Sequence, residues 1–219
     1  MSSKERLLVI DTCGETAGVA LSVGTRVMAS EDLGRGSASA EIVAAVRRLQ
    51  EQVGWRLAEL DAIGVVSGPG SFTGMRAGLA TAKGLCEAAG LRMAAVSRLE
   101  VLADAAAMDD GLVALDAGRG ELYVRDVRSA REWLCAGDAV EGLVDGRALI
   151  VAEERVAERL ARCAPVLRSL HVGDAVGVVL RQMREGGSDV SLVDANYVRE
   201  ESDIYRKPGQ TGRAPGAEV

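Results

Sequence analysis

Two short apolar segments that each end in an aspartate constrain the fold more than any other feature of this 219-residue chain. Residues 8–11 read Leu-Val-Ile-Asp and residues 113–116 read Val-Ala-Leu-Asp, and a small turn and a second apolar strand follow each of them. Short apolar runs bounded by turn residues are typical of buried strands. We interpret the two segments as the first strands of a duplicated α/β unit.

The first hundred residues follow the order of a mixed sheet. Three strands separated by short turns come first, and helices and strands then alternate. The expected strands are 7–10, 18–23, 26–30, 62–67 and 93–96, and the expected helices are 39–53, 72–89 and 99–108. This order predicts antiparallel pairing first and parallel pairing afterwards, with helices on the faces of the sheet.

The second half repeats this order in a shorter and less regular form. The expected strands are 113–116, 121–127, 131–134 and 148–152, and the expected helix is 156–164. We therefore predict two domains, residues 1–100 and residues 101–205, with a short element over 194–199 that packs back onto the body. Residues 206–219 hold two of the four prolines and almost no large apolar residues, which predicts a disordered tail.

The charge balance and the aromatic content disfavour nucleic-acid binding by the chain alone. The 32 acidic residues exceed the 26 basic ones, which gives a net charge of −6, so the chain gains little from a phosphate backbone. Two Trp, three Tyr and one Phe are too few for a surface on which bases stack. We expect no tight, independent binding of nucleic acid.

Histidine and cysteine content limits the chemistry as well. The single histidine, His171, argues against most metal sites built on imidazole, and the four separated cysteines are expected to be reduced thiols. Cys13 follows the first strand, where nothing nearby would lower its pKa, and its function stays open. No apolar stretch reaches the ~18 residues of a membrane span, and no secretory signal is recognised, so we expect a cytoplasmic protein.

The segment 68–76, Gly-Pro-Gly-Ser-Phe-Thr-Gly-Met-Arg, links a predicted buried strand to a predicted helix. Ser71 or Thr73 can cap that helix, and the glycines let the backbone fold back tightly. Amides at a helix N-terminus can hold an anion, so one interpretation is a nucleotide or anion contact by Gly70, Ser71, Thr73 and Asp11. The other is a capped turn, because the segment matches neither a P-loop nor Gly-x-Ser-x-Gly.

The helix expected over 72–89 is apolar on two sides. One stripe is formed by Met75, Leu79, Ala82, Cys86 and Ala89, and a second, mostly small stripe by Gly74, Gly78, Thr81, Leu85 and Ala88. Such a helix must be covered on both sides. Either the chain covers both sides itself, or one side is offered to a partner, because short side chains let two helices approach closely.

Three stretches of the sequence together resemble the TsaB (YeaZ) family. They are Leu-Val-Ile-Asp-Thr at 8–12, the segment 67–78, and Leu-Asp-Ala-Gly-Arg-Gly-Glu-Leu-Tyr at 115–123, and a looser likeness continues to Tyr-Val-Arg at 197–199. The resemblance implies an α/β fold of the actin-like ATPase (ASKHA, ribonuclease H-like) superfamily, duplicated, with mixed sheets flanked by helices. It also implies a part in the threonylcarbamoyladenosine modification of tRNA.

The resemblance further implies an accessory subunit without catalytic residues. TsaB-like proteins pair with a TsaD-like catalytic subunit, which holds the metal and transfers the threonylcarbamoyl group to adenosine, and a TsaE-like ATPase joins them. We therefore expect no metal and no cofactor on the chain alone, with ATP and Mg²⁺ acting at the level of the complex. One histidine cannot supply the His-x-x-x-His pair of the catalysts, and residues 37–41, where relatives often carry a histidine, read Ser-Ala-Ser-Ala-Glu.

By resemblance, the helices over 39–53 and 72–89 would meet a TsaD-like subunit, or a second copy of the chain in a homodimer. The residues expected at this interface are Ile42, Val46, Leu49, Gly74, Gly78, Thr81, Ala82 and Leu85.

The alternative function is a small phosphotransferase or ATPase of the same fold that uses Asp11 and Asp116. In sugar-kinase-like and actin-like folds, aspartates at these strand ends hold Mg²⁺ and phosphates. Aspartate is also a common turn residue that binds local amides. The turn after Asp11 lacks the paired glycines of a phosphate-binding hairpin, so we favour the turn role.

Overall fold

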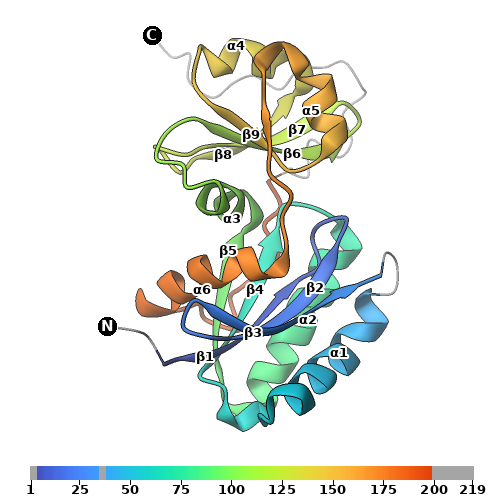
Figure 1. The fold of residues 1–219 in the computed structure, drawn as a ribbon, viewed down its shortest axis with the longest axis vertical. Coiled ribbons are helices and arrows are strands. Elements are labelled where there is room, and N and C mark those ends of the chain that lie inside the picture. Colours follow the sequence, from blue (N-terminus) through green and yellow to red (C-terminus); the bar gives the residue numbers. More distant parts are fainter. Residues whose placement is uncertain (1–3, 35–37, 199–219) are drawn as a thin grey trace.

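The computed structural model describes residues 4–34 and 38–198, which form two lobes (Figure 1). Each lobe is built on a five-stranded sheet. We call the part that contains the N-terminal sheet, drawn in the lower half of Figure 1, the first lobe, and the part that contains the other sheet the second lobe. None of the helices in these two ranges combines the length and the apolar character needed to cross a membrane.

The first sheet has the strand order β3-β2-β1-β4-β5. Its strands are β1 (Arg6–Asp11), β2 (Ala17–Val23), β3 (Arg26–Leu33), β4 (Ala62–Gly68) and β5 (Arg92–Ser97). β2 pairs antiparallel with β1 and β3, whereas β4 pairs parallel with β1 and β5. The predicted change from antiparallel to parallel pairing is confirmed, because short turns join antiparallel strands and helical crossovers join parallel ones.

Helices cover both faces of the first sheet (Figure 1). α1 (Ala38–Val53) contacts β2 and β3, α2 (Phe72–Ala89) contacts β4, and the two helices contact each other. α6 (Ala175–Arg184) lies on the opposite face, where Val179 packs against Gly64 of β4. α6 is not among the helices predicted from the sequence.

The second sheet repeats the connectivity of the first. Its strands are β6 (Leu112–Gly118), β7 (Glu121–Asp126), β8 (Glu132–Ala136), β9 (Leu149–Val151) and β10 (Val166–Leu167), in the order β10-β9-β6-β7-β8. β7 pairs antiparallel with β6 and β8, and β9 pairs parallel with β6 and β10. β6 therefore takes the place of β1, and the predicted duplication with a shortened second copy is confirmed.

The helices of the second lobe are short. They are α4 (Val140–Val144) and α5 (Glu154–Arg159), with 3-10 turns at Gly137–Ala139 and Ala161–Cys163; two further 3-10 turns, Leu57–Glu59 and Val172–Asp174, lie elsewhere. The helix predicted over 156–164 is therefore divided between α5 and a 3-10 turn. Ala164 adopts a left-handed conformation, and Pro165 disfavours helix at the residue before it, so no helix continues past this point.

α3 (Arg98–Ala105) lies between the two lobes (Figure 1). Leu99 and Leu102 are fully buried in a cluster with Val113 and Leu115 of the second sheet. The same helix contacts β4, β5 and α6 of the first lobe. α3 is therefore shared between the lobes and is shorter than the helix predicted over 99–108.

The last described part of the chain returns to the first lobe. The Ser188 N–H donates a hydrogen bond to Met93 O (2.8 Å), and the Asn196 N–H donates one to Ser67 O (2.8 Å). The segment predicted to pack back onto the body does so as far as it is described. The second predicted domain, 101–205, thus contributes α6 and this segment to the first lobe, while the division at residue 100 stays a prediction. The tail predicted for residues 206–219 lies outside the described residues.

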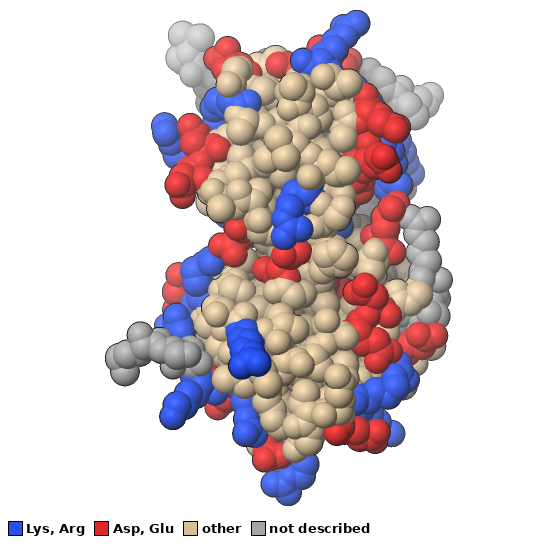
Figure 2. All heavy atoms as spheres, in the orientation of Figure 1, with Lys and Arg blue, Asp and Glu red and all other residues tan. Residues whose placement is uncertain are grey.

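Charged side chains of both signs are mixed on the face shown in Figure 2. Lys and Arg alternate with Asp and Glu along the outline of both lobes, and the centre of each lobe is largely uncharged. On this face the described residues form no continuous basic surface. The outline narrows between the lobes, where the cavity described next is found.

Candidate functional site

A cavity of about 430 Å³ lies between the lobes. Its walls come from the turn between β1 and β2, the starts of α2 and α3, and the residues that end or follow β6 and β9. Of the residues predicted to contact a nucleotide or an anion, Gly70, Ser71 and Thr73 line the cavity, as does Asp116. Asp11 is buried beside the lining residues and does not line the cavity itself.

The loop that precedes α2 packs its main chain against the turn between β1 and β2. The Ser71 N–H donates to Cys13 O (2.8 Å), and Thr12 Oγ1 donates to Gly74 O (2.6 Å). A Cβ at Gly70 would overlap Cys13 O, and a Cβ at Gly74 would overlap Thr12 O. The glycines of this motif therefore permit a close approach of two backbones.

Ser71 also caps α2. Its Oγ accepts a hydrogen bond from the Gly74 N–H (3.2 Å), which satisfies one of the free amides at the start of the helix. The capped-turn interpretation is confirmed for this residue. An anion contact at the same loop stays a prediction.

Asp11 and Cys13 are buried side by side. Asp11 Oδ1 accepts a hydrogen bond from the Cys13 N–H (2.8 Å), which confirms the favoured turn role. Burial raises the pKa of the Asp11 carboxyl, and the positive charge of Arg98 lowers it in part. Burial, with the charge of Asp11, raises the pKa of the Cys13 thiol well above its usual value, and the thiol donates to Val66 O (3.0 Å). Cys13 is therefore a packed thiol and not a thiolate nucleophile.

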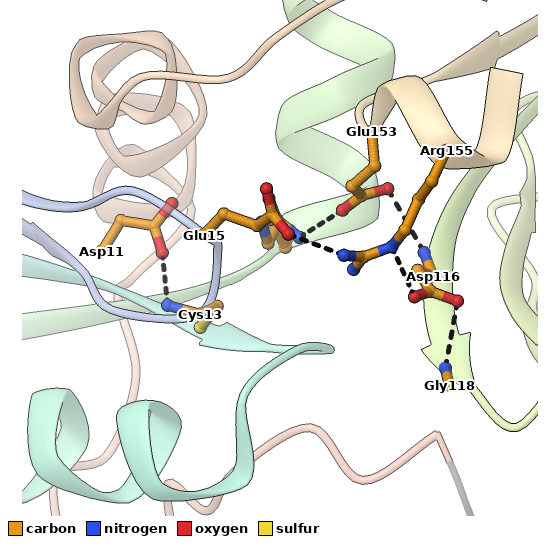
Figure 3. A network of polar contacts seen from close by, with 8 residues as sticks. Asp11, Cys13, Glu15, Asp116, Gly118, Glu153 and Arg155 are labelled. Atoms are coloured by element: carbon orange, nitrogen blue, oxygen red, sulfur yellow. Dashed lines mark hydrogen bonds and ion pairs between the residues drawn. The ribbon is translucent and has the colours of Figure 1, made fainter. Parts of the chain in front are cut away.

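Side chains of opposite charge meet across the cavity (Figure 3). Arg98 Nη1 lies 3.2 Å from Glu153 Oε1, and both side chains are less than a tenth exposed. Glu153 Oε2 accepts a hydrogen bond from the Asp116 N–H (3.2 Å). Arg155 Nε donates to Asp116 Oδ2 (2.8 Å), and Arg155 Nη1 lies 2.7 Å from Glu15 Oε1. These charges compensate one another within the protein.

Asp116 repeats the turn role of Asp11 in the second lobe. Its Oδ1 accepts a hydrogen bond from the Gly118 N–H (3.1 Å), two residues further on, and its Oδ2 is held by Arg155. Both carboxylate oxygens therefore have partners from the chain itself. The two repeated aspartates stabilise equivalent turns, and Asp116 in addition orients an arginine.

Arg98, Glu153 and Arg155 also line the cavity and were not predicted as site residues. The repeat could have revealed two of them, because β9 is the counterpart of β4, and the residues after β9 therefore face the same cleft as the loop after β4. Nothing in the sequence distinguishes Arg98 from the many other arginines.

A metal site needs several ligating side chains that converge on one point. Within residues 4–34 and 38–198, no group of three His, Cys, Asp or Glu side chains could hold a metal ion. His171 is exposed at the start of a 3-10 turn.

The structure corrects most of the residues predicted at a partner interface. Ile42, Val46, Leu49 and Ala82 are each at most 2% exposed and belong to the core of the first lobe. They are buried because α1 and α2 turn their apolar sides to the sheet. Gly74 and Gly78 face inward too, since a Cβ at Gly78 would overlap Thr12 Oγ1 and one at Gly74 would overlap Thr12 O.

The outward side of α1 and α2 carries mostly small residues, most of them exposed and the rest half-buried. A Cβ at Gly84 would meet nothing within 4 Å, and Val43 is 45% exposed. Thr81 and Leu85, the other two predicted interface residues, are half-buried at the edge of this outward side, and Leu85 also packs against the core of the first lobe. We call the following residues the α1–α2 face: Val43, Ala44, Ala80, Thr81, Gly84, Leu85 and Ala88.

The chain is similar to proteins whose names refer to the threonylcarbamoyladenosine modification of tRNA. The family model described as "TsaD: tRNA N6-adenosine threonylcarbamoyltransferase" matches residues 37–172, more than half of the chain. The tRNA threonylcarbamoyladenosine biosynthesis protein TsaB of Escherichia coli is 33% identical over 143 residues, which cover 64% of this chain and 62% of that protein. TsaB of Bacillus subtilis is 36% identical over 120 residues, which cover 53% of this chain and 52% of that protein. The chain belongs to the TsaB (YeaZ) family.

The fold agrees with membership of the TsaB family. A crystal structure from Pseudomonas aeruginosa, described as an uncharacterized protein with similarity to peptidase YEAZ, has a TM-score of 0.75 at 25% identity and covers 89% of this chain and 100% of that chain. The two similar mixed sheets are the duplicated α/β fold of the actin-like ATPase (ASKHA) superfamily that the resemblance implies. The chain spans about half to three fifths of the length of the curated relatives it matches.

Proposed function

We propose that the chain is a non-catalytic scaffold or activator subunit for threonylcarbamoylation of adenosine in tRNA. It binds a TsaD-like catalytic subunit, and a TsaE-like ATPase joins the two. Membership of the TsaB family and the names of the relatives from Escherichia coli and Bacillus subtilis support the reaction. The match to the TsaD family model supports a partner with the same fold.

The observation that carries this proposal is the α1–α2 face. Small residues such as Ala80, Gly84 and Ala88 leave the backbone of α2 open to close approach by another helix. Two related subunits that pair about a pseudo-twofold axis use the same surface on both partners. A TsaD-like subunit would therefore present its equivalent helices to this face, and a second copy of the chain would do the same in a homodimer.

The cleft favours this accessory role over a phosphotransferase. Phosphoryl transfer would need Asp11 and Asp116 to be free to hold Mg²⁺ and phosphates. Asp11 is buried and bound to the Cys13 N–H, and Asp116 is bound by Arg155 and the Gly118 N–H. We propose that ATP and Mg²⁺ act through the partner subunits and not through this cleft.

The mixed charge on the face in Figure 2 agrees with a subunit that does not bind tRNA tightly on its own. Tight binding of a phosphate backbone usually requires a continuous basic surface. In the proposed complex, most of the affinity for tRNA comes from the other subunits.

Gly84→Arg tests the α1–α2 face directly. Space around Gly84 lets the folded chain accept the side chain, whereas a partner helix packed there would be displaced. We expect affinity for the TsaD-like subunit of the same cell to fall by about thirtyfold or more, or ~2 kcal/mol. Gly142→Arg in α4 is the matched control, because a Cβ there also meets nothing within 4 Å.

Calorimetry on the purified subunits gives the comparison. Equal affinity of the wild type and Gly84→Arg would show that the partner binds elsewhere. Formation of threonylcarbamoyladenosine by the isolated chain would contradict the non-catalytic role. ATP turnover by the isolated chain that is lost in Asp11→Asn would favour the phosphotransferase.

A further inference from the structure

The chain passes from the first lobe into α3 at Ser97 and Arg98, and both side chains reach carboxylates of the second lobe. Ser97 Oγ donates to Glu132 Oε1 on β8 (2.5 Å), and Arg98 Nη1 lies 3.2 Å from Glu153 Oε1, just after β9. β8 and β9 are separated by β6 and β7 in the second sheet. The crossing point is therefore attached to the second sheet at two well-separated strands.

Glu132 adds a third attachment between the lobes. Its Oε2 accepts a hydrogen bond from Asn196 Nδ2 (2.9 Å), and the Asn196 N–H donates to Ser67 O at the end of β4. Arg125 Nη1 donates to Glu132 Oε1 (2.8 Å) and compensates its charge. The side chain of Glu132 is only 13% exposed, so these bonds are largely shielded from water.

Arg155 forms an outer contact at the mouth of the cleft. It joins α5 of the second lobe to Glu15 in the turn between β1 and β2, at 2.7 Å (Figure 3). The two side chains are 56% and 48% exposed, compared with 8% and 9% for the Arg98–Glu153 pair. Salt screens exposed ion pairs far more than buried ones, so the two contacts should respond differently to ionic strength.

We propose that these contacts are a lock that sets the angle between the lobes. Ser97–Glu132 and Arg98–Glu153 hold the crossing point at any salt concentration, and Arg155–Glu15 closes the cleft at low salt and releases it at high salt. Ion pairs of the protein itself thus join the two walls of this cleft. In an open cleft, a bound ligand would join the walls instead. This inference concerns the chain alone and does not depend on the proposed function.

Hydrogen exchange of the full chain tests the outer contact. We expect Arg155→Gln to raise exchange of the amides of residues 12–16, on the opposite side of the cleft, by about two- to fivefold at low salt, the effect of one exposed ion pair. The amides of residues 116–118 report in addition the loss of the Arg155–Asp116 bond within the second lobe. In 1 M NaCl the wild type should approach the variant, because the ion pair is then screened. Arg162→Gln, which removes an exposed arginine from the same lobe, is the control and should leave both segments unchanged.

Glu153→Gln tests the buried part of the lock. It keeps an acceptor for the Asp116 N–H but leaves the Arg98 charge without its partner, so we expect about tenfold or faster exchange around the cleft at every salt concentration. Exchange in β4, within the core of the first sheet, reports global unfolding. Unchanged exchange in β4 together with faster exchange at the cleft supports a change in lobe angle.

Two results would overturn the lock. Equal exchange in Arg155→Gln and Arg162→Gln would show that the outer contact does not hold the cleft. A uniform rise across β4 and the cleft in Glu153→Gln would show that the buried pair supports stability as a whole and not the angle between the lobes.

Discussion

The two lobes share one topology but approach the cleft with different chemistry. In the first lobe the connection from β4 to α2 meets the turn after β1 through main-chain contacts, which Gly70 and Gly74 allow. In the second lobe the equivalent connection from β9 to α5 meets the turn after β6 through the side chains of Glu153 and Arg155. A duplicated fold can therefore keep its strand pairing while a contact changes from backbone packing to charge.

The difference has consequences for how each lobe responds to its surroundings. A contact between main-chain groups does not titrate and is little affected by salt, whereas ion pairs respond to both pH and ionic strength. The first lobe should therefore be sensitive to added volume at the cleft, and the second to lost or altered charge.

Arg98→Met is expected to have the largest effect. It leaves the Glu153 carboxylate buried without its cation, and breaking such a pair costs ~3–5 kcal/mol of unfolding free energy. Urea denaturation measures the loss. Arg98→Met/Glu153→Gln should recover a large part of it, because no unpaired charge remains at this pair; a double variant as unstable as the sum of the single ones would argue against a charge-based contact.

Gly74→Ala tests the packing contact of the first lobe. The added methyl group would overlap Thr12 O, so α2 must move away from the turn, and overpacking of this kind costs ~1–3 kcal/mol. The same urea titration detects it. Wild-type stability in Gly74→Ala would show that the two backbones are not in close contact.

Asp126 and Asp11 should give the lobes opposite responses to acid. The Ser129 N–H and Arg147 lower the pKa of Asp126 in the second lobe to about 2, below the ~3.9 of an unfolded chain. Its stabilisation is therefore present above pH ~4 and is lost as the pH falls towards 2. Burial raises the pKa of Asp11 in the first lobe, so protonation of that group favours the folded state.

Asp126→Asn should flatten the acid limb of the stability curve and cost ~1 kcal/mol at neutral pH. Denaturant titrations from pH 6 to pH 2 measure both effects. An unchanged acid limb in this variant would mean that other carboxylates control the acid response of the second lobe.

The smallest expected effect is an increase in the free energy of unfolding. Gly84→Ala in α2 places a methyl group in open space and lowers the backbone entropy of the unfolded chain, which should stabilise the protein by ~0.5–1 kcal/mol. Gly142→Ala in α4 is the matched change in the second lobe, and it should gain less because α4 has only five residues. A thermal melt of each variant ranks them, and a loss of stability in Gly84→Ala would mean that the α1–α2 face is covered.

The change from antiparallel to parallel pairing in the first sheet was predictable from sequence, because the strands, turns and helices of the first half have regular periods; β10, which has only two residues, was not predicted. Asp11 and Asp116 each end a short apolar strand, and this repeat indicated the second sheet. α6 was missed although its buried residues recur at helical spacing, because an irregular stretch precedes it. It follows β10 as α3 follows β5, so it is the second-copy counterpart of α3. Its buried residues are Ala175, Val176, Val178, Val179, Leu180 and Met183.

The cleft was only partly predictable. Gly70, Ser71 and Thr73 belong to a local motif, so the sequence places them together at a strand-to-helix turn. The contact of Arg155 with Glu15 joins residues that are far apart in sequence, and no local pattern records it. The apolar residues of α1 could be recognised as one face of a helix, but periodicity alone does not say whether that face meets the chain's own sheet or a partner.

The contact between Gly70 and Cys13 restricts which amino acids position 70 can hold far more than which ones position 13 can hold. Gly70 faces a main-chain oxygen of Cys13, and every amino acid supplies that oxygen in the same place. A different small residue at position 13 would therefore preserve the contact, whereas no change at position 13 could make room for a side chain at position 70. Among related chains, variation should accumulate in the turn while the glycine of the opposing loop persists.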